Sequence, residues 1–154
     1  MKHYVLGFAL LFSLGACESG KNEHKHKDGE HQHKHEGMKL GAENQKLFDE
    51  VMAVHDEVMP KHHTIAKYRD SLKAELADEK LKKDTATLHK YEKIHKDLDY
   101  AYKAMSMWMQ EFDTNLDKKP EAEQKAYLEK QKEAIDKVSE SMKSSLAAAE
   151  SRKK

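Results

Sequence analysis

The residues with the clearest potential for chemistry lie in a short polar tract, "EHKHKDGEHQHKHEG", which runs from Glu23 to Gly37. Within its two clusters the imidazoles lie two positions apart, so they share one side of an extended chain. Neutral imidazole is a common ligand of Zn(II), Cu(II) and Ni(II), and short His-rich tracts are typical of metal binding. The tract therefore predicts a loose, pH-dependent site for transition metals. Its candidate ligands are His24, His26, His31, His33 and His35.

The histidine tract has a second interpretation, as a polar spacer that happens to be rich in histidine. It contains no apolar residues that could form a core, so we expect a disordered neck over residues 17–41. Either interpretation requires a folded domain after the neck.

A second group of candidate ligands combines methionine with histidine. Met and His recur at three- and four-residue spacings after Phe48, and three methionines surround Trp108 in "AMSMWMQEF". If the two segments are antiparallel helices, these residues face each other, and thioether with imidazole is a ligand set suited to Cu(I). Core packing is the competing interpretation, because methionine at helical spacing usually fills the interior of a bundle. This candidate soft-metal site comprises Met52, His55, Met59, His62, Met105 and Met109.

We find no pattern in the sequence that indicates catalysis. There is no recognisable nucleophile–base constellation and no glycine-rich phosphate loop, so we predict that the protein is not an enzyme. His95 follows Glu92 by three residues, which is half of a di-iron pattern, but the helical region has no second Glu-x-x-His. We therefore expect His95 to be a core or half-buried residue.

The first residues, "MKHYVLGFALLFSLGAC", have the features of a secretory signal peptide over residues 1–16, with an apolar run too short to span a bilayer. The end of this segment, Leu14-Gly15-Ala16-Cys17, resembles the lipobox of bacterial lipoproteins. The resemblance implies cleavage before Cys17, acylation of that residue, including palmitate-like chains, and a membrane anchor. Because Glu18 follows the cysteine instead of Asp, it also implies sorting to the outer membrane. An ordinary signal peptide with an incidental cysteine is the alternative.

Helices must position these residues, because the chain after Ala42 repeats apolar residues at alternating spacings of three and four. We predict an all-α fold, an antiparallel up-down-up three-helix bundle or coiled coil over residues 42–154. The helices should cover residues 42–83, 85–116 and 120–150, with Pro60 kinking or splitting the first and the end of the third fraying. The expected buried seam of the second helix includes Tyr91, His95, Leu98, Tyr102, Met105 and Met109.

Two segments, "FDEVMAVHDEVMPK" and "AMSMWMQEF", resemble a group of small helical lipoproteins from Gram-negative bacteria that are sometimes labelled viral A-type inclusion protein-like. The resemblance implies a helical fold and an envelope location, on the periplasmic or the surface face of the outer membrane, and no activity.

Charge and composition complete the functional prediction. Acidic and basic residues balance, 28 against 28, which argues against nucleic acid as a partner. We predict a lipid-anchored envelope protein whose neck captures or buffers Zn, Cu or Ni ions, with no required cofactor. The alternatives are a structural coiled-coil lipoprotein that binds another envelope protein through its helical faces, and a periplasmic helical chaperone.

Overall fold

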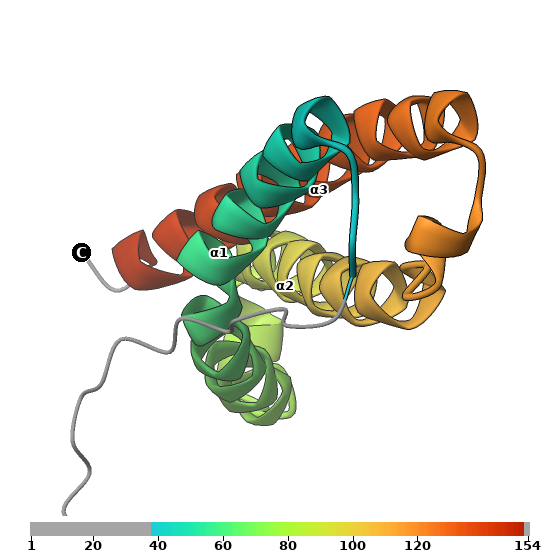
Figure 1. Ribbon diagram of the computed structural model, residues 1–154. Helices are drawn as coiled ribbons and strands as arrows, with labels where there is room; N and C mark the ends of the chain where they lie inside the picture. The colour runs from blue at the N-terminus through green and yellow to red at the C-terminus, as the bar shows by residue number, and fades with distance from the viewer. Residues whose placement is uncertain (1–37, 153–154) are drawn as a thin grey trace, which may run out of the picture. The chain divides into compact units, whose positions relative to one another are not determined.

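The computed structural model describes residues 38–152, and this part of the chain is all-helical (Figure 1). Each of the three long helices packs against the other two. The predicted all-α fold class is therefore confirmed for the described residues. The helices are α1 (Ala42–Glu75), α2 (Thr85–Glu111) and α3 (Glu121–Ser151), and the short 3-10 turns between them are η1 (Leu81–Lys83) and η2 (Leu116–Lys118).

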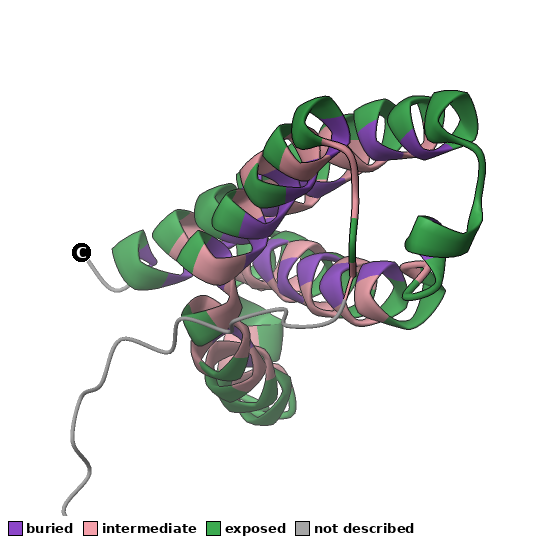
Figure 2. Ribbon diagram, viewed as in Figure 1, coloured by how far each residue is buried: buried purple, intermediate pink, exposed green. Residues whose placement is uncertain are grey.

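The core follows a seven-residue repeat that is clearest on α1. Val51, Val58, Ile65 and Leu72 are all completely buried. Seven residues nearly complete two helical turns, so these side chains form one stripe along the helix. Figure 2 shows the buried positions on the sides of the helices that face one another, with the exposed positions outside.

The buried stripe of α2 is displaced by one residue from the predicted seam. Leu98 and Met105 are buried as expected. The polar edges of histidine and tyrosine stay at the boundary of the core, where they reach hydrogen-bond partners, and apolar neighbours take the interior. Ile94, Ala101 and Trp108 are buried in place of His95, Tyr102 and Met109, which are half-buried.

Ion pairs set the register of α1 against α3. The first two pairs each join residues that are 82 positions apart in the chain. A constant separation means that α1 and α3 advance in the same direction. The three pairs between these helices are Lys125–Glu43, Lys132–Glu50 and Lys143–Glu57.

Contacts between α1 and α2 run in the opposite sense. The ring of Phe48, early in α1, lies 6.1 Å from the ring of Phe112, just after α2. Later in α1, His62 stacks on Tyr102, which comes earlier in α2. The two helices are therefore antiparallel where they touch.

The first connection begins earlier than predicted. The first helix was expected to reach Lys83, but α1 ends at Glu75, and Leu81–Lys83 form a 3-10 turn. The Asp78 side chain accepts a hydrogen bond of 2.8 Å from the backbone N–H of Lys80. Asp in this role stabilises a turn that competes with the helix, which explains the early end.

The ends of α2 are fixed by side-chain hydrogen bonds. Asp84 caps its N-terminus, because its carboxylate accepts a hydrogen bond from the Thr87 N–H at 3.1 Å. The helix ends at Glu111, before the predicted residue 116. After that end, the N–H of Asp113 donates to the hydroxyl of Tyr127 on α3 at 2.7 Å, which ties the second connection to the next helix.

Pro60 does not split α1, which is helical from Ala42 to Glu75. Figure 1 shows that α1 bends in its middle. Of the two predicted effects of Pro60, the helix therefore shows a kink and not a break. In the turn before the proline, Lys61 Nζ donates to the Glu57 carbonyl at 2.9 Å. The carbonyl that loses its helical donor at Pro60 is that of Asp56, so this bond serves the neighbouring carbonyl and not the one that proline leaves free.

Both ends of the described segment pack on the helices. Met38 and Leu40, which the sequence assigned to the neck, lie half-buried against the core. The predicted fraying of the third helix is wrong, because Arg152 is buried and its Nη2 donates to Glu75 at 2.8 Å. Its guanidinium also covers the ring of Tyr68 at 5.3 Å. The rest of the predicted neck, residues 17–37, lies outside the described residues.

Candidate functional site

Two of the predicted sites belong to the part of the chain that lies outside the described residues. These are the lipidation site at Cys17 and the five histidines of the histidine tract. Both therefore stay predictions that rest on the sequence.

The candidate soft-metal site lies along the contact between α1 and α2. Its members differ in exposure: three are buried and three are half-buried. The buried members are Met52, His55 and Met105, and the half-buried members are Met59, His62 and Met109.

His55 is held on one face and at one ring nitrogen. Its ring stacks on Trp108 of α2, with centroids 5.5 Å apart and an angle of 28° between the planes. Its Nδ1 lies 2.8 Å from a carboxylate oxygen of Asp56. A carboxylate at one nitrogen fixes the tautomer and orientation of an imidazole, both in packed cores and beside metal ligands.

His62 has a fuller set of contacts. Its ring stacks on Tyr102 at 4.1 Å and 15°, and its Nε2 lies 3.1 Å from the carbonyl oxygen of that residue. The same nitrogen lies 3.3 Å from the hydroxyl of Ser106. The guanidinium of Arg69 lies 4.5 Å from the centre of the Tyr102 ring. These contacts account for His62 as a residue that joins α1 to α2.

Nitrogen and oxygen ligands do not converge on a metal position in residues 38–152: no group of three His, Cys, Asp or Glu side chains is arranged to hold an ion. Glu92, which the sequence placed beside His95, lies 3.3 Å from Nδ1 of His89. A metal at the α1–α2 contact would therefore depend on the methionine sulfur atoms.

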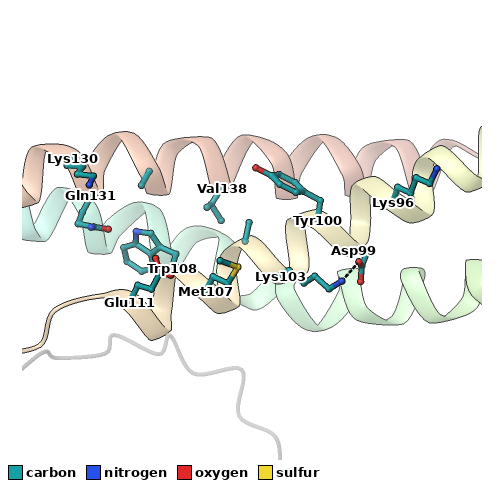
Figure 3. A pocket seen from close by; sticks show the side chains of 12 residues that line it. Lys96, Asp99, Tyr100, Lys103, Met107, Trp108, Glu111, Lys130, Gln131 and Val138 are labelled. Atoms are coloured by element: carbon teal, nitrogen blue, oxygen red, sulfur yellow. Dashed lines mark hydrogen bonds and ion pairs between the residues drawn. The ribbon is translucent and has the colours of Figure 1, made fainter.

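Sequence analysis missed a groove between α2 and α3, shown in Figure 3. Its volume is about 680 Å³, and most of the surface that lines it is apolar, although charged and polar side chains make up half of its lining residues. Tyr100 and Met107, which are 67% and 56% exposed, are the two exposed large hydrophobic residues of the described part, and both line it. They lie seven residues apart with Ala104 between them, so a second apolar stripe on this helix was the signal in the sequence.

Trp108 borders both the α1–α2 contact and the groove. One side of its indole stacks on His55, and the residue also lines the groove. Its Nε1 is buried without a hydrogen-bond partner, and Figure 3 shows it turned toward Gln131 of α3. Because the chain contains one tryptophan, its fluorescence reports on this position alone.

The charges at the groove are unevenly paired. Lys103 lies 2.6 Å from Asp99 and, by hydrogen bonding, holds the pKa of that carboxyl below its ordinary value. Lys96 and Lys130 lie at opposite ends of the groove (Figure 3), and neither has an ion-pair partner among the described residues. Glu111 also lies at the Lys130 end.

Comparison with known proteins finds no matching family model, no matching curated protein and no matching solved structure. The family resemblance noted from the sequence therefore stays a prediction. Among residues 38–152, no helix has both the length and the apolar character that crossing a bilayer requires.

Proposed function

We propose that the protein is a lipid-anchored, non-enzymatic component of the cell envelope whose histidine tract captures transition-metal ions. One observation carries this proposal: five imidazoles lie within Glu23–Gly37, in two clusters with single-residue spacing. They follow soon after Cys17 and its lipobox-like sequence, so the captured metal would be held near a membrane surface, and we assign that surface to the outer membrane.

The helices would serve as the folded body that carries this tract. We propose that α1, α2 and α3 form an up-down-up three-helix bundle and that the neck before it is disordered. The common direction of α1 and α3 and the antiparallel contacts of α1 with α2 support the bundle. The composition of residues 17–37, which lacks core-forming side chains, supports the disordered neck.

Metal capture by such a tract would be reversible and sensitive to pH. Imidazole binds metal in its neutral form, and its ordinary pKa is about 6.5, so acidification below that value would release the ion. We expect affinity for Zn(II), Cu(II) and Ni(II) without strong selection among them, because a flexible tract imposes no fixed geometry.

The test is a calorimetric titration of the full chain with each of the three metals. In one variant, His24, His26, His31, His33 and His35 are replaced by alanine. The matched control replaces Lys25, Lys27 and Lys34 by glutamine in the same tract and keeps every histidine. Binding should disappear in the first variant and persist in the control. Binding by the histidine-free variant at wild-type strength would refute the proposal.

The candidate soft-metal site needs a separate titration with Cu(I). Met105 is buried and Met109 half-buried, so both can be changed to leucine at nearly constant volume. If the sulfur atoms bind copper, the histidine-free variant still takes up Cu(I), and adding Met105→Leu and Met109→Leu abolishes the uptake. If they only pack, the histidine-free variant does not compete with a Cu(I) chelator. The contacts of His62 with Tyr102 and Ser106 favour packing.

A further inference from the structure

We propose that the groove between α2 and α3 binds a single-chain anionic amphiphile, a fatty acid. The hydrocarbon tail would lie over the apolar lining near Met107 and Trp108, and the carboxylate would lie beside Lys96. The proposal does not depend on the histidine tract or on lipidation of Cys17.

The apolar side chains of the groove favour a ligand with a hydrocarbon part. Tyr100 and Met107 expose more than half of their surface although they are large and apolar, and both do so in this groove. A ligand that covers them removes that surface from water, which is the usual driving force for binding apolar molecules. Methionine adapts its shape easily, so Met107 can follow a flexible chain.

The length and volume of the groove suit a small, elongated ligand. Its α2 side runs from Lys96 to Glu111, a length of about 22 Å at the helical rise of 1.5 Å per residue. Its volume of about 680 Å³ lies within the range of roughly 300–1,000 Å³ typical of small-molecule sites. An elongated hollow of this volume can hold an extended hydrocarbon chain along α2.

The distribution of charge sets the direction of the ligand. At one end of the groove Asp99 is neutralised by Lys103 at 2.6 Å, and Arg69 lies 3.9 Å from the same carboxylate. Lys96 at this end therefore keeps an uncompensated positive charge. At the other end, Lys130 and Glu111 carry opposite charges without forming a direct ion pair, so that end has no net charge (Figure 3). A carboxylate is thus attracted to the Lys96 end, and the tail extends toward Trp108.

A second copy of the chain fits this surface less well. Stable protein interfaces use roughly 20–30 residues on each side, whereas the groove exposes two large apolar side chains. A small amphiphile can bury those two side chains completely without needing a wide surface.

The experiment is a titration of the full chain with laurate, followed by the fluorescence of Trp108 and by calorimetry. Dodecanol, which has the same chain length but no charge, is the comparison ligand. We expect saturable binding of one laurate per chain with a shift of the tryptophan emission, and weaker binding of dodecanol. A tryptophan response that never saturates would overturn the proposal, because it indicates non-specific adsorption.

Variants of the chain test the binding of the carboxylate and of the hydrocarbon tail separately. Lys96→Glu should weaken laurate binding by about tenfold and leave dodecanol unchanged, whereas Lys130→Glu should have little effect on either. Met107→Lys should weaken both ligands by about tenfold, whereas Ala53→Lys, an exposed change on α1 away from the groove, should change neither.

These positions are exposed, so we expect every variant to fold. Circular dichroism verifies this. Equal laurate affinity in wild type and Met107→Lys would overturn the proposal. So would a concentration-dependent dimer of the ligand-free wild type that Met107→Lys abolishes, since that result would assign the groove to a second copy.

Discussion

Trp108 shows how one side chain can serve two neighbouring regions. The indole stacks on His55 from α1, and the same residue lines the groove toward α3. Its N–H has no partner, although a buried donor without a hydrogen bond usually costs stability. The ring contacts of Trp108 with His55 and Phe112 must outweigh that cost for the residue to stay buried here.

Two neighbouring residues of α2 allow a direct test of the assigned burial. Leu98 is completely buried and Tyr100 is 67% exposed. Leu98→Ala is expected to lower the free energy of unfolding by about 2–5 kcal/mol, because it leaves a cavity in the core. Tyr100→Ala should change it by roughly 0.5 kcal/mol or less. Urea denaturation followed by circular dichroism measures both, and equal losses would contradict this orientation of α2.

The sequence predicts most core positions but leaves one ambiguity within α2. Leu98 and Met105 belong to two overlapping seams, one through Ala101 and one through Tyr102. Hydrophobic spacing alone cannot choose between them, because tyrosine and histidine are amphipathic and can occupy either the core or its edge. The choice depends on which side chains of α1 and α3 face the helix, and that is a property of the packed molecule.

At the scale of the elements, helix types were easier to predict than helix ends. Leu76 continues the apolar spacing one residue past Glu75, so the pattern does not mark the end of the helix. The end depends on a local competition, in which the Asp78 carboxylate stabilises a turn. At Asp84 the same chemistry was easier to recognise, because the residue stands directly before a new apolar repeat.

The register between α1 and α3 can be tested by exchanging charges. Glu50→Lys or Lys132→Glu alone should lower the thermal midpoint, because each change sets like charges against each other. The double variant should recover part of the loss. As a control, Glu50→Lys combined with Lys125→Glu should show no recovery, because Lys125 faces Glu43. Strictly additive effects of the first pair, measured at low salt, would contradict the register.

At the scale of the whole molecule, surface carboxylates make stability depend on acidity. Hydrogen bonds from lysine lower the pKa of Glu43, Glu50 and Glu57 below the ordinary value of 4.5. Asp84 has its pKa lowered by hydrogen bonds from Thr87. The folded state therefore holds these groups ionised at a pH where the unfolded chain binds protons.

We expect the free energy of unfolding to be steady above the ordinary Glu pKa of 4.5 and to fall as pH drops through the lowered values. Urea unfolding between pH 7 and pH 3 measures this dependence. Glu50→Gln combined with Glu57→Gln should reduce the loss of unfolding free energy between pH 7 and pH 3. Glu79→Gln serves as the control, because its side chain is 81% exposed and its partner Lys82 lies three residues away and not on another long helix. If the double variant loses as much unfolding free energy with acidification as the wild type, the Lys132–Glu50 and Lys143–Glu57 pairs are not a source of acid sensitivity.

The groove marks the limit of what the sequence could predict about function. The histidine tract is recognisable because its candidate ligands lie close together in the sequence, so their proposed role does not depend on a fold that brings them together. The groove is made by Tyr100 and Met107 of α2 with Ala134 and Val138 of α3, and it exists only once the two helices pack. Exposed apolar residues on one helix do not show which neighbour completes the hollow.

The common direction of α1 and α3 also has a mechanical consequence. Met38 leads into the start of α1, whereas Arg152, just after α3, is bonded to Glu75 at the end of α1, so a pull applied at Met38 and Arg152 acts along the helices in opposite directions. The force is then a shear that loads all three Lys–Glu pairs and the interdigitated core together, and it does not peel one contact at a time. If the chain is tethered before residue 38, tension on its far end would load the α1–α3 contact along its whole length.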